Sequence, residues 1–210
     1  MTPDTRPAPI ATHAGTPSFA LIVLATCMAF VVGQLDVTIV NVALPAMAAD
    51  LGAGVAGLQW VVDAYAVSFA AFMLSAGAFG DRFGARRAFQ WGMGIFGLAS
   101  IACALAPGIL ALDAARVLQG FGAAVMLPNS LALLNHALAH DTRARARGIG
   151  YWTAAGSISI ALGPVLGGLL VASVGWRAIF WVNVPLCLVG GWLSTHLHET
   201  PTGGARPPLD

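Results

Sequence analysis

Three ionisable side chains stand inside long apolar stretches of the sequence: Asp36, Asp63 and Arg116. Such a group costs about 2.5–3.5 kcal/mol at bilayer depth, so it usually faces a cavity or a charged partner. Because removal from water favours the neutral form of a carboxylate, Asp36 is a candidate to take up and release a proton. Asp63 shares a helix face with Gln59 near the end of its stretch. The three residues predict a proton-coupling site; alternatively, Asp36 only fixes helix contacts and Asp63 is simply hydrated.

Arg116 begins a stripe of helical spacing. Gln119 and Gly120 follow it at i+3 and i+4, so a guanidinium, an amide and a small residue share one face. A permanent positive charge there would modulate the protonation of a nearby carboxylate such as Asp36. The alternative is an arginine that extends toward the membrane interface and pairs with Asp113, three residues earlier. The cost of burying an unpaired charge favours the first interpretation.

The composition shows which elements must position these groups. The chain is 58% hydrophobic and 9% charged, whereas about a quarter of a soluble domain is charged. It is therefore expected to be an all-α membrane protein with six transmembrane helices, over residues 18–44, 58–79, 88–106, 109–134, 149–174 and 179–197. We expect a bundle over 18–197 between flexible tails, 1–17 and 198–210. The first and fourth spans end or bend at Leu44-Pro45 and Leu127-Pro128, which hints at two three-helix repeats.

All ten basic residues are arginine, and their positions predict the orientation of the chain. Arg177 falls on one side of the expected spans, and eight arginines fall on the side of both termini: Arg6, Arg82, Arg86, Arg87, Arg143, Arg145, Arg147 and Arg206. Because cytoplasmic loops retain basic residues, both termini are expected in the cytoplasm. The net charge of +1 leaves no electrostatic footprint for nucleic acid, and the isolated cysteines form no metal or disulfide pattern.

The segment between the second and third spans combines glycines with an acid and three arginines: Gly77, Asp81, Arg82, Gly84, Arg86 and Arg87. Gly77 would allow close approach and Gly84 a turn, while Asp81 would meet arginines or a helix N-terminus. The arginines would meet lipid headgroups. This combination predicts a gating loop; the alternative is a basic loop that only sets topology.

Prolines and glycines mark the last two spans: Gly163, Pro164, Gly167, Gly168 and Pro185. Each proline removes one helical hydrogen bond and frees a carbonyl, which predicts a hinge. Gly163 and Gly167 form a small-xxx-small face for close helix contact. Static packing without motion remains the alternative.

Five segments along the chain resemble, in the same order, the sequence signatures of one family of membrane transporters. GAFGDRFGARR (77–87) resembles the signature between the second and third helices, departing at Phe79 and Ala85, and LDAARVLQGFGAA (112–124) resembles a fourth-helix signature that the family associates with proton transfer. GPVLGG (163–168) resembles a fifth-helix antiporter signature, with Ser159 replacing an earlier glycine. LDVTIVNVALP (35–45) and WRAIFWVNVP (176–185) are similar to one branch. The family is the major facilitator superfamily, and the branch is its fourteen-helix drug:proton antiporters.

The resemblance implies a secondary transporter of the bacterial cytoplasmic membrane that exports amphipathic or cationic small molecules, using the proton gradient and no cofactor. Six helices make one half of that fold, so a C-terminal half or a second copy is expected as a partner beside the lipid bilayer. Residues 207–210 resemble the segment before a seventh helix, which predicts a truncated transporter. The alternative is an inactive fragment or a non-transporting scaffold.

An enzyme is not expected, because an intramembrane serine protease needs a Gly-x-Ser-Gly setting that neither Ser157 nor Ser159 has. Side chains that could line a substrate pocket are proposed by type and location alone: Phe30, Asn41, Trp60, Tyr65, Phe72 and Gln119.

Overall fold

The structure, a computed structural model, describes residues 17–199, and all regular elements in that range are α-helices. They are α1 (Phe19–Leu51), α2 (Val55–Phe83), α3 (Ala85–Ala104), α4 (Ile109–Ala137), α5 (Thr142–Ser173), α6 (Ala178–Trp181) and α7 (Asn183–Ser194). Only Val182 separates α6 from α7, so helix is found at all six stretches predicted as spans. By length and composition, α1, α2, α4 and α5 can cross a membrane. The predicted tails, 1–17 and 198–210, fall almost wholly outside the described residues.

Polar side chains cap the first turns of α1 and α5. Ser18 caps α1 by accepting a hydrogen bond from the Leu21 amide at 3.3 Å. Asp141 caps α5 in the same way, accepting from the Ala144 amide at 2.8 Å, so α5 begins well before residue 149. Neither α1 nor α4 ends at its Leu-Pro pair, since Pro45 and Pro128 each remove only one helical hydrogen bond within a packed helix.

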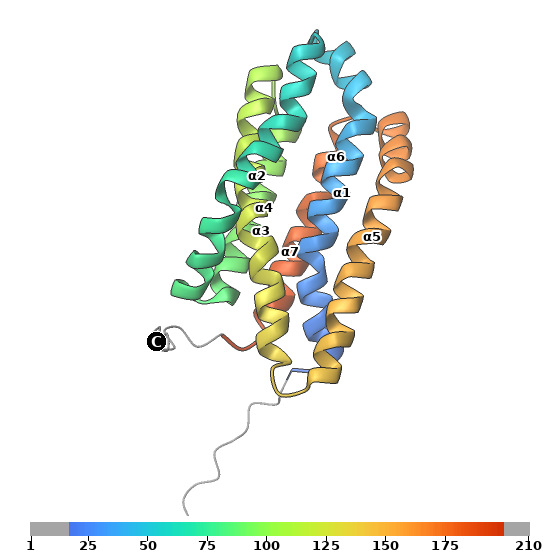
Figure 1. Ribbon diagram of the computed structural model, residues 1–210. Helices are drawn as coiled ribbons and strands as arrows, with labels where there is room; N and C mark the ends of the chain where they lie inside the picture. The colour runs from blue at the N-terminus through green and yellow to red at the C-terminus, as the bar shows by residue number, and fades with distance from the viewer. Residues whose placement is uncertain (1–16, 200–210) are drawn as a thin grey trace, which may run out of the picture.

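Close pairs of helices organise the bundle (Figure 1). α1 packs along α5, and α2 and α3 both pack along α4, while α7 contacts α1 and α3. Glycines set the α3–α4 distance: a Cβ atom on Gly92 would lie 2.5 Å from the backbone nitrogen of Met126. A Cβ on Gly122 would lie 2.7 Å from the nitrogen of Phe96. Backbones this close fix the facing sides of α3 and α4, where much of the site lies.

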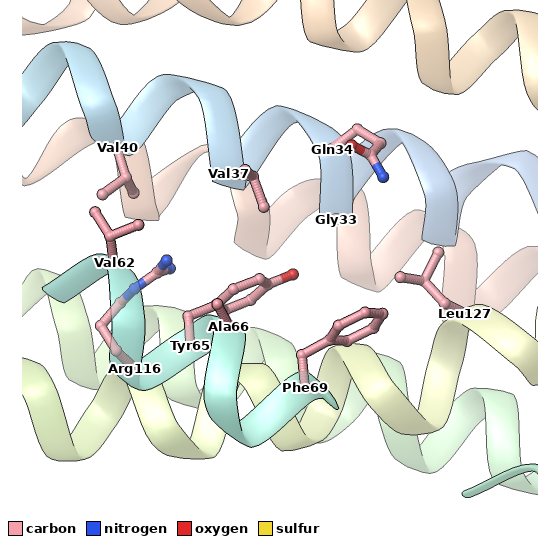
Figure 2. A pocket seen from close by; sticks show the side chains of 10 residues that line it. All are labelled: Gly33, Gln34, Val37, Val40, Val62, Tyr65, Ala66, Phe69, Arg116 and Leu127. Carbon is pink, nitrogen blue, oxygen red and sulfur yellow. The ribbon is translucent and has the colours of Figure 1, made fainter. Parts of the chain in front are cut away.

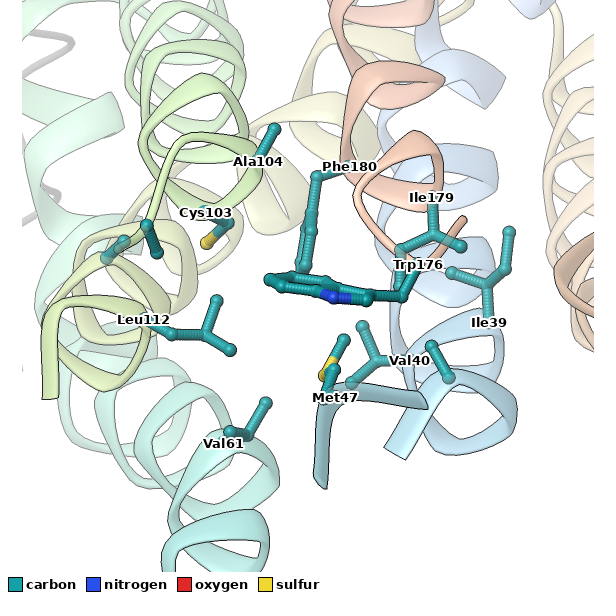
Figure 3. Close-up of a cluster of buried hydrophobic side chains, with 13 residues drawn as sticks. Ile39, Val40, Met47, Val61, Cys103, Ala104, Leu112, Trp176, Ile179 and Phe180 are labelled. Atoms are coloured by element: carbon teal, nitrogen blue, oxygen red, sulfur yellow. The ribbon is translucent and has the colours of Figure 1, made fainter. Parts of the chain in front are cut away.

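Apolar side chains fill the bundle near the α1–α2, α3–α4 and α5–α6 connections (Figure 3), among them Ile39, Met47, Val61, Leu112, Ile179 and Phe180. Polar contacts tie this end together. Arg177 donates to Asp50 Oδ2 at 2.6 Å and to the Ala106 carbonyl at 3.3 Å, and the Trp176 indole donates to the same Asp50 oxygen at 3.0 Å. The end of α1 is therefore joined to both neighbouring connections.

Candidate functional site

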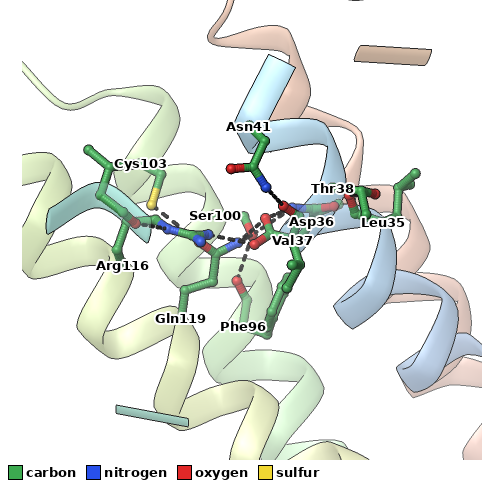
Figure 4. A network of polar contacts seen from close by, with 12 residues as sticks. Leu35, Asp36, Val37, Thr38, Asn41, Phe96, Ser100, Cys103, Arg116 and Gln119 are labelled. Atoms are coloured by element: carbon green, nitrogen blue, oxygen red, sulfur yellow. Dashed lines mark hydrogen bonds and ion pairs between the residues drawn. The ribbon is translucent and has the colours of Figure 1, made fainter. Parts of the chain in front are cut away.

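Asp36 on α1 and Arg116 on α4 form a buried ion pair (Figure 4). The two residues are 0% and 1% exposed, and the Arg116 Nη1 donates to Asp36 Oδ2 at 2.5 Å. Arg116 makes no hydrogen bond with Asp113. A charge taken out of water must be compensated, and here each ion is the partner of the other. The pair joins α1 to α4 across the interior of the bundle.

Neutral groups complete the surroundings of the pair. The Gln119 amide donates to Asp36 Oδ1 at 2.8 Å, and its oxygen accepts from Arg116 Nη1 at 2.8 Å. Asn183 on α7 also donates to Asp36 Oδ1, at 2.8 Å. The Arg116 Nε donates to the Val61 carbonyl of α2 at 2.9 Å. All three partners of Asp36 are donors, which suits the acceptor-only chemistry of a carboxylate.

A close contact between α2 and α4 brings the second helix to this site. Gly120 faces the carbonyl oxygen of Tyr65, and any side chain there would collide with it. The Ser68 hydroxyl donates to the Val117 carbonyl at 2.7 Å and locks the same contact. As a result the Tyr65 ring lies 4.4 Å from the Arg116 guanidinium carbon, a cation–π distance.

A cavity of about 200 Å³ lies between α1, α2 and α4 (Figure 2). Arg116 and Tyr65 belong to its wall, so the buried pair borders the cavity through the arginine. The other lining residues are Gly33, Gln34, Val37, Val40, Val62, Ala66, Phe69 and Leu127. Drug-sized pockets measure about 300–1,000 Å³, so this space fits water and part of a ligand rather than a whole drug.

The remaining predicted coupling and pocket residues lie elsewhere. Asp63 is partly buried and has no hydrogen bond or ion pair with another residue in 17–199. Phe30 stacks on Trp152 with centroids 4.0 Å apart, and Phe72 packs edge-on against Phe121. Two further candidates are exposed: Trp60 and Asn41, whose amide donates to Val37. Of the six pocket candidates, only Tyr65 lines the cavity and only Gln119 joins the polar network.

The predicted gating loop is a tight corner between two helices. α2 runs to Phe83 and α3 starts at Ala85, leaving only Gly84 with a positive φ of 96°. No atom lies within 4 Å of a Cβ built on Gly77, so the close approach expected there is made instead by Gly80, against the Asn129 side chain. Asp81 and Arg82 are exposed, and Asp81 pairs with no other described residue.

Two arginines of the corner contact the segment that follows α7. Arg86 donates to Glu199 Oε2 at 3.2 Å and to the Leu197 carbonyl at 2.8 Å, and Arg87 lies 3.5 Å from the same carboxylate oxygen. Arg86 therefore has protein acceptors, while contact of these arginines with lipid headgroups stays a prediction. The start of α3 and the segment that follows α7 are held together.

Among the predicted glycines of α5, two contact α1 closely and one faces no neighbouring atom. Gly163 faces the Thr38 side chain, and a Cβ on Gly167 would lie 2.9 Å from Ile39 Cγ1, so these glycines bring α5 against α1. Gly168 has nothing within 4 Å. The proline positions are Pro164, within α5, and Pro185, in the first turn of α7.

Ser100 and Asn183 join the network although neither was chosen from the sequence. Ser100 accepts from the Gln119 amide at 2.9 Å and donates to the Phe96 carbonyl at 2.8 Å. The signal was present, because Asn183 is a buried amide within an apolar span and polar side chains there usually bond across helices. Its partner could not be named without knowing that α7 lies beside α1.

A bundle with membrane-length helices and a buried charge pair bordering a cavity defines an integral membrane transport protein. The chain belongs to the Major Facilitator Superfamily, whose family profile matches residues 26–209. Membership in a transport family agrees with the expectation that the chain is not an enzyme.

Several curated relatives are similar in sequence. The chain is 44% identical to a methylenomycin A resistance protein of Streptomyces coelicolor, over 80% of this chain and 35% of that protein. It is 44% identical to the drug efflux pump JefA of Mycobacterium tuberculosis, over 86% of this chain and 35% of that protein. It is 46% identical to the multidrug resistance protein Stp of the same species, over 79% of this chain and 31% of that protein. The chain thus spans about a third of the length of these relatives.

A solved structure shares the fold. A crystal structure of the peptide transporter POT superposes with a TM-score of 0.74 over 89% of this chain and 38% of that chain, at 16% sequence identity.

Proposed function

We propose that the chain forms one half of a proton-coupled transporter that exports drugs or other amphipathic or cationic compounds. The Asp36–Arg116 pair carries the proposal, because it is buried at the wall of a cavity and joins two helices. The relatives named for drug efflux and resistance support the substrate class.

Protonation of Asp36 would change the contact between α1 and α4. An ionised Asp36 compensates the Arg116 charge, whereas a neutral acid leaves that guanidinium to find other acceptors or water. The cavity at Arg116 gives such water a place. A ligand or conformation that favours one protonation state then shifts the population of the other, which is the requirement for coupling.

The proposed architecture includes the finer features expected from the sequence. Six helices, counting α3 and the α6–α7 segment, cross the bacterial cytoplasmic membrane as two three-helix repeats, with residues 1–17 and 198–210 as cytoplasmic tails. The corner at Gly84 acts as a gate, and Pro164 and Pro185 as hinges. A C-terminal half or a second copy supplies the opposite wall, which agrees with a chain that covers about 35% of a relative.

The test is coupled transport in vesicles that contain the chain alone or together with a C-terminal half. A fluorescent cationic drug and a pH-sensitive dye are followed together. Drug movement should be accompanied by opposite proton movement, and Asp36→Asn should abolish the coupling because the amide cannot carry the proton. Asp50→Asn is the matched control: it is an exposed carboxylate on the same helix and should leave the coupling intact.

Each outcome decides one point. Coupling that survives Asp36→Asn would remove Asp36 from the mechanism. Transport by the chain alone, together with crosslinks between copies, would identify a second copy as the missing wall. Absence of transport in every combination would leave a non-transporting scaffold or inactive fragment.

A further inference from the structure

Asn183 differs from every other residue around Asp36 because half of its amide is unused. Its nitrogen donates to Asp36 Oδ1 at 2.8 Å and lies 3.5 Å from the Ser100 hydroxyl. Its oxygen is buried and has no hydrogen-bond partner. Buried polar atoms are nearly always paired, so an orphaned acceptor beside a titratable carboxyl group calls for an explanation.

A protonated Asp36 would need a hydrogen-bond acceptor, which none of its present partners provides. The carboxylate accepts hydrogen bonds from Arg116, Gln119 and Asn183. A carboxylic acid carries a hydroxyl that must donate, and a buried donor without an acceptor is costly. A partner that can offer an acceptor in place of its donor would therefore stabilise the neutral acid.

Two of the three partners cannot do this. A guanidinium has no acceptor atom, which excludes Arg116. Turning the Gln119 amide would place its NH₂ group against Arg116 Nη1, which its oxygen now accepts at 2.8 Å. Asn183 has no such restraint, since the only further contact of its nitrogen is the long one to Ser100.

The other titratable groups that act on Asp36 make no hydrogen bond with it, apart from Arg116. They are Tyr65 from α2, Cys103 from α3 and Cys187 from α7, in addition to Arg116 from α4. Cys103 donates its thiol hydrogen to Gln119, and no hydrogen bond joins Tyr65 or Cys187 to Asp36 among residues 17–199. Asn183 is thus the amide free to turn.

We propose that Asn183 is a positioning residue whose side-chain amide turns over when Asp36 takes up a proton. The nitrogen holds the carboxylate in the ionised state, and the orphaned oxygen accepts from the carboxylic acid in the neutral state. Because Asn183 is the first residue of α7, next to the interruption at Val182, the protonation state of α1 is passed to the α6–α7 junction. This inference rests on the proposed function only in taking Asp36 as the group that binds the proton.

The test is an infrared pH titration of the purified chain in lipid. The carboxylic acid C=O band that disappears in Asp36→Asn reports the protonation of Asp36. In Asn183→Leu, the acid loses its acceptor, while the carboxylate keeps Arg116 on one oxygen and Gln119 on the other. Because Asn183 is a partner of Asp36 in both protonation states, the informative readout is the frequency of the acid C=O band, which should rise when the carboxyl hydroxyl loses its acceptor. Asn129→Leu, which removes another buried amide, is the matched control and should leave the band unchanged.

A second measurement needs no variant that could misfold. The sequence has four asparagines, so selective ¹⁵N labelling gives few side-chain amide signals in the wild-type chain. The Asn183 signal should shift with the same midpoint as the Asp36 band. An unchanged acid band in Asn183→Leu, or an Asn183 signal that ignores pH, would overturn the inference and leave proton coupling intact. Absence of any Asp36-dependent acid band would instead refute the proposed proton coupling itself.

Discussion

At the scale of single residues, Asp36 and Arg116 depend on each other for stability. Two opposite charges at low dielectric compensate each other, but removing one strands the other without water. Gln119 contributes by donating to the acid and accepting from the base, so it holds both ends of the pair. The pair should therefore respond to substitution as a unit, not as two independent residues.

Replacement of the arginine tests this unit. Arg116→Met should lower the free energy of unfolding by about 3–5 kcal/mol, because the Asp36 carboxylate remains buried without a cation. The double variant Asp36→Asn with Arg116→Met should lose less than Arg116→Met alone, since no charge is left stranded. Thermal unfolding of the purified chain in detergent measures both, with the exposed Arg82→Met as control. Purely additive losses would show that the two side chains do not depend on each other.

At the scale of helices, close contacts of glycine determine which neighbours meet. The α1–α5 contact depends on Gly163 and Gly167, while Gly168 on the same helix faces open space. Helix positions followed from the apolar stretches of the sequence because hydrocarbon length fixes the length of a span. The helix partners did not, since sequence spacing shows which residues share a face but not which helix covers that face.

The glycines of α5 give a paired prediction. Gly163→Ala should destabilise the bundle by about 1–3 kcal/mol, because the added methyl group overlaps the Thr38 side chain. Gly168→Ala should be neutral or stabilising by up to about 1 kcal/mol, since alanine favours helix and nothing obstructs it. Unfolding midpoints of the two variants provide the comparison. Equal effects at both positions would mean that α5 does not pack on α1 in this register.

At the corner between α2 and α3, the turn could be predicted from the sequence but the contacts with distant residues could not. The turn at Gly84 was predicted, but the partner of Arg86 was not, because Glu199 lies more than a hundred residues away, beyond α7. The same limit applied to Asn183, which reaches Asp36 from α7. Pairings between distant helices depend on the assembled bundle, whereas Asp36, Arg116 and Gln119 could be chosen because charge and amide groups are rare in hydrocarbon.

Arg86 and Arg82 can be compared directly. Arg86→Ala should cost about 1–3 kcal/mol of stability, because Arg86 holds the carbonyl of Leu197 and the Glu199 carboxylate. Arg82→Ala should stay within about 0.5 kcal/mol, since Arg82 is exposed and contacts only the Phe83 ring among the described residues. Part of the Arg86 effect should fade at high salt, because the Glu199 pair is partly exposed. Indistinguishable variants would mean that the bonds of Arg86 to the segment after α7 contribute no stability.

At the scale of the whole molecule, the arginines are distributed unevenly between the two ends of the bundle. The corner arginines Arg82, Arg86 and Arg87 and those at the start of α5 share one end, while Arg177 stands alone at the other. Large apolar side chains are exposed along the length of α2 and α5, where lipid or a second half can cover them. Exposed apolar helix surfaces are typical of a membrane protein, and the uneven arginines predict a direction across the membrane.

That direction can be measured in intact cells by cysteine labelling. The native cysteines, Cys27, Cys103 and Cys187, are all buried and give a quiet background. Val55→Cys at the start of α2, 83% exposed in the wild type, should react with a membrane-impermeant maleimide added outside, while Ala139→Cys in the α4–α5 connection should react only after permeabilisation. The reason is that the arginines beside the second position keep that end in the cytoplasm. The reverse labelling pattern would place Arg82, Arg86 and Arg87 outside the cell and would contradict the predicted cytoplasmic position of both termini.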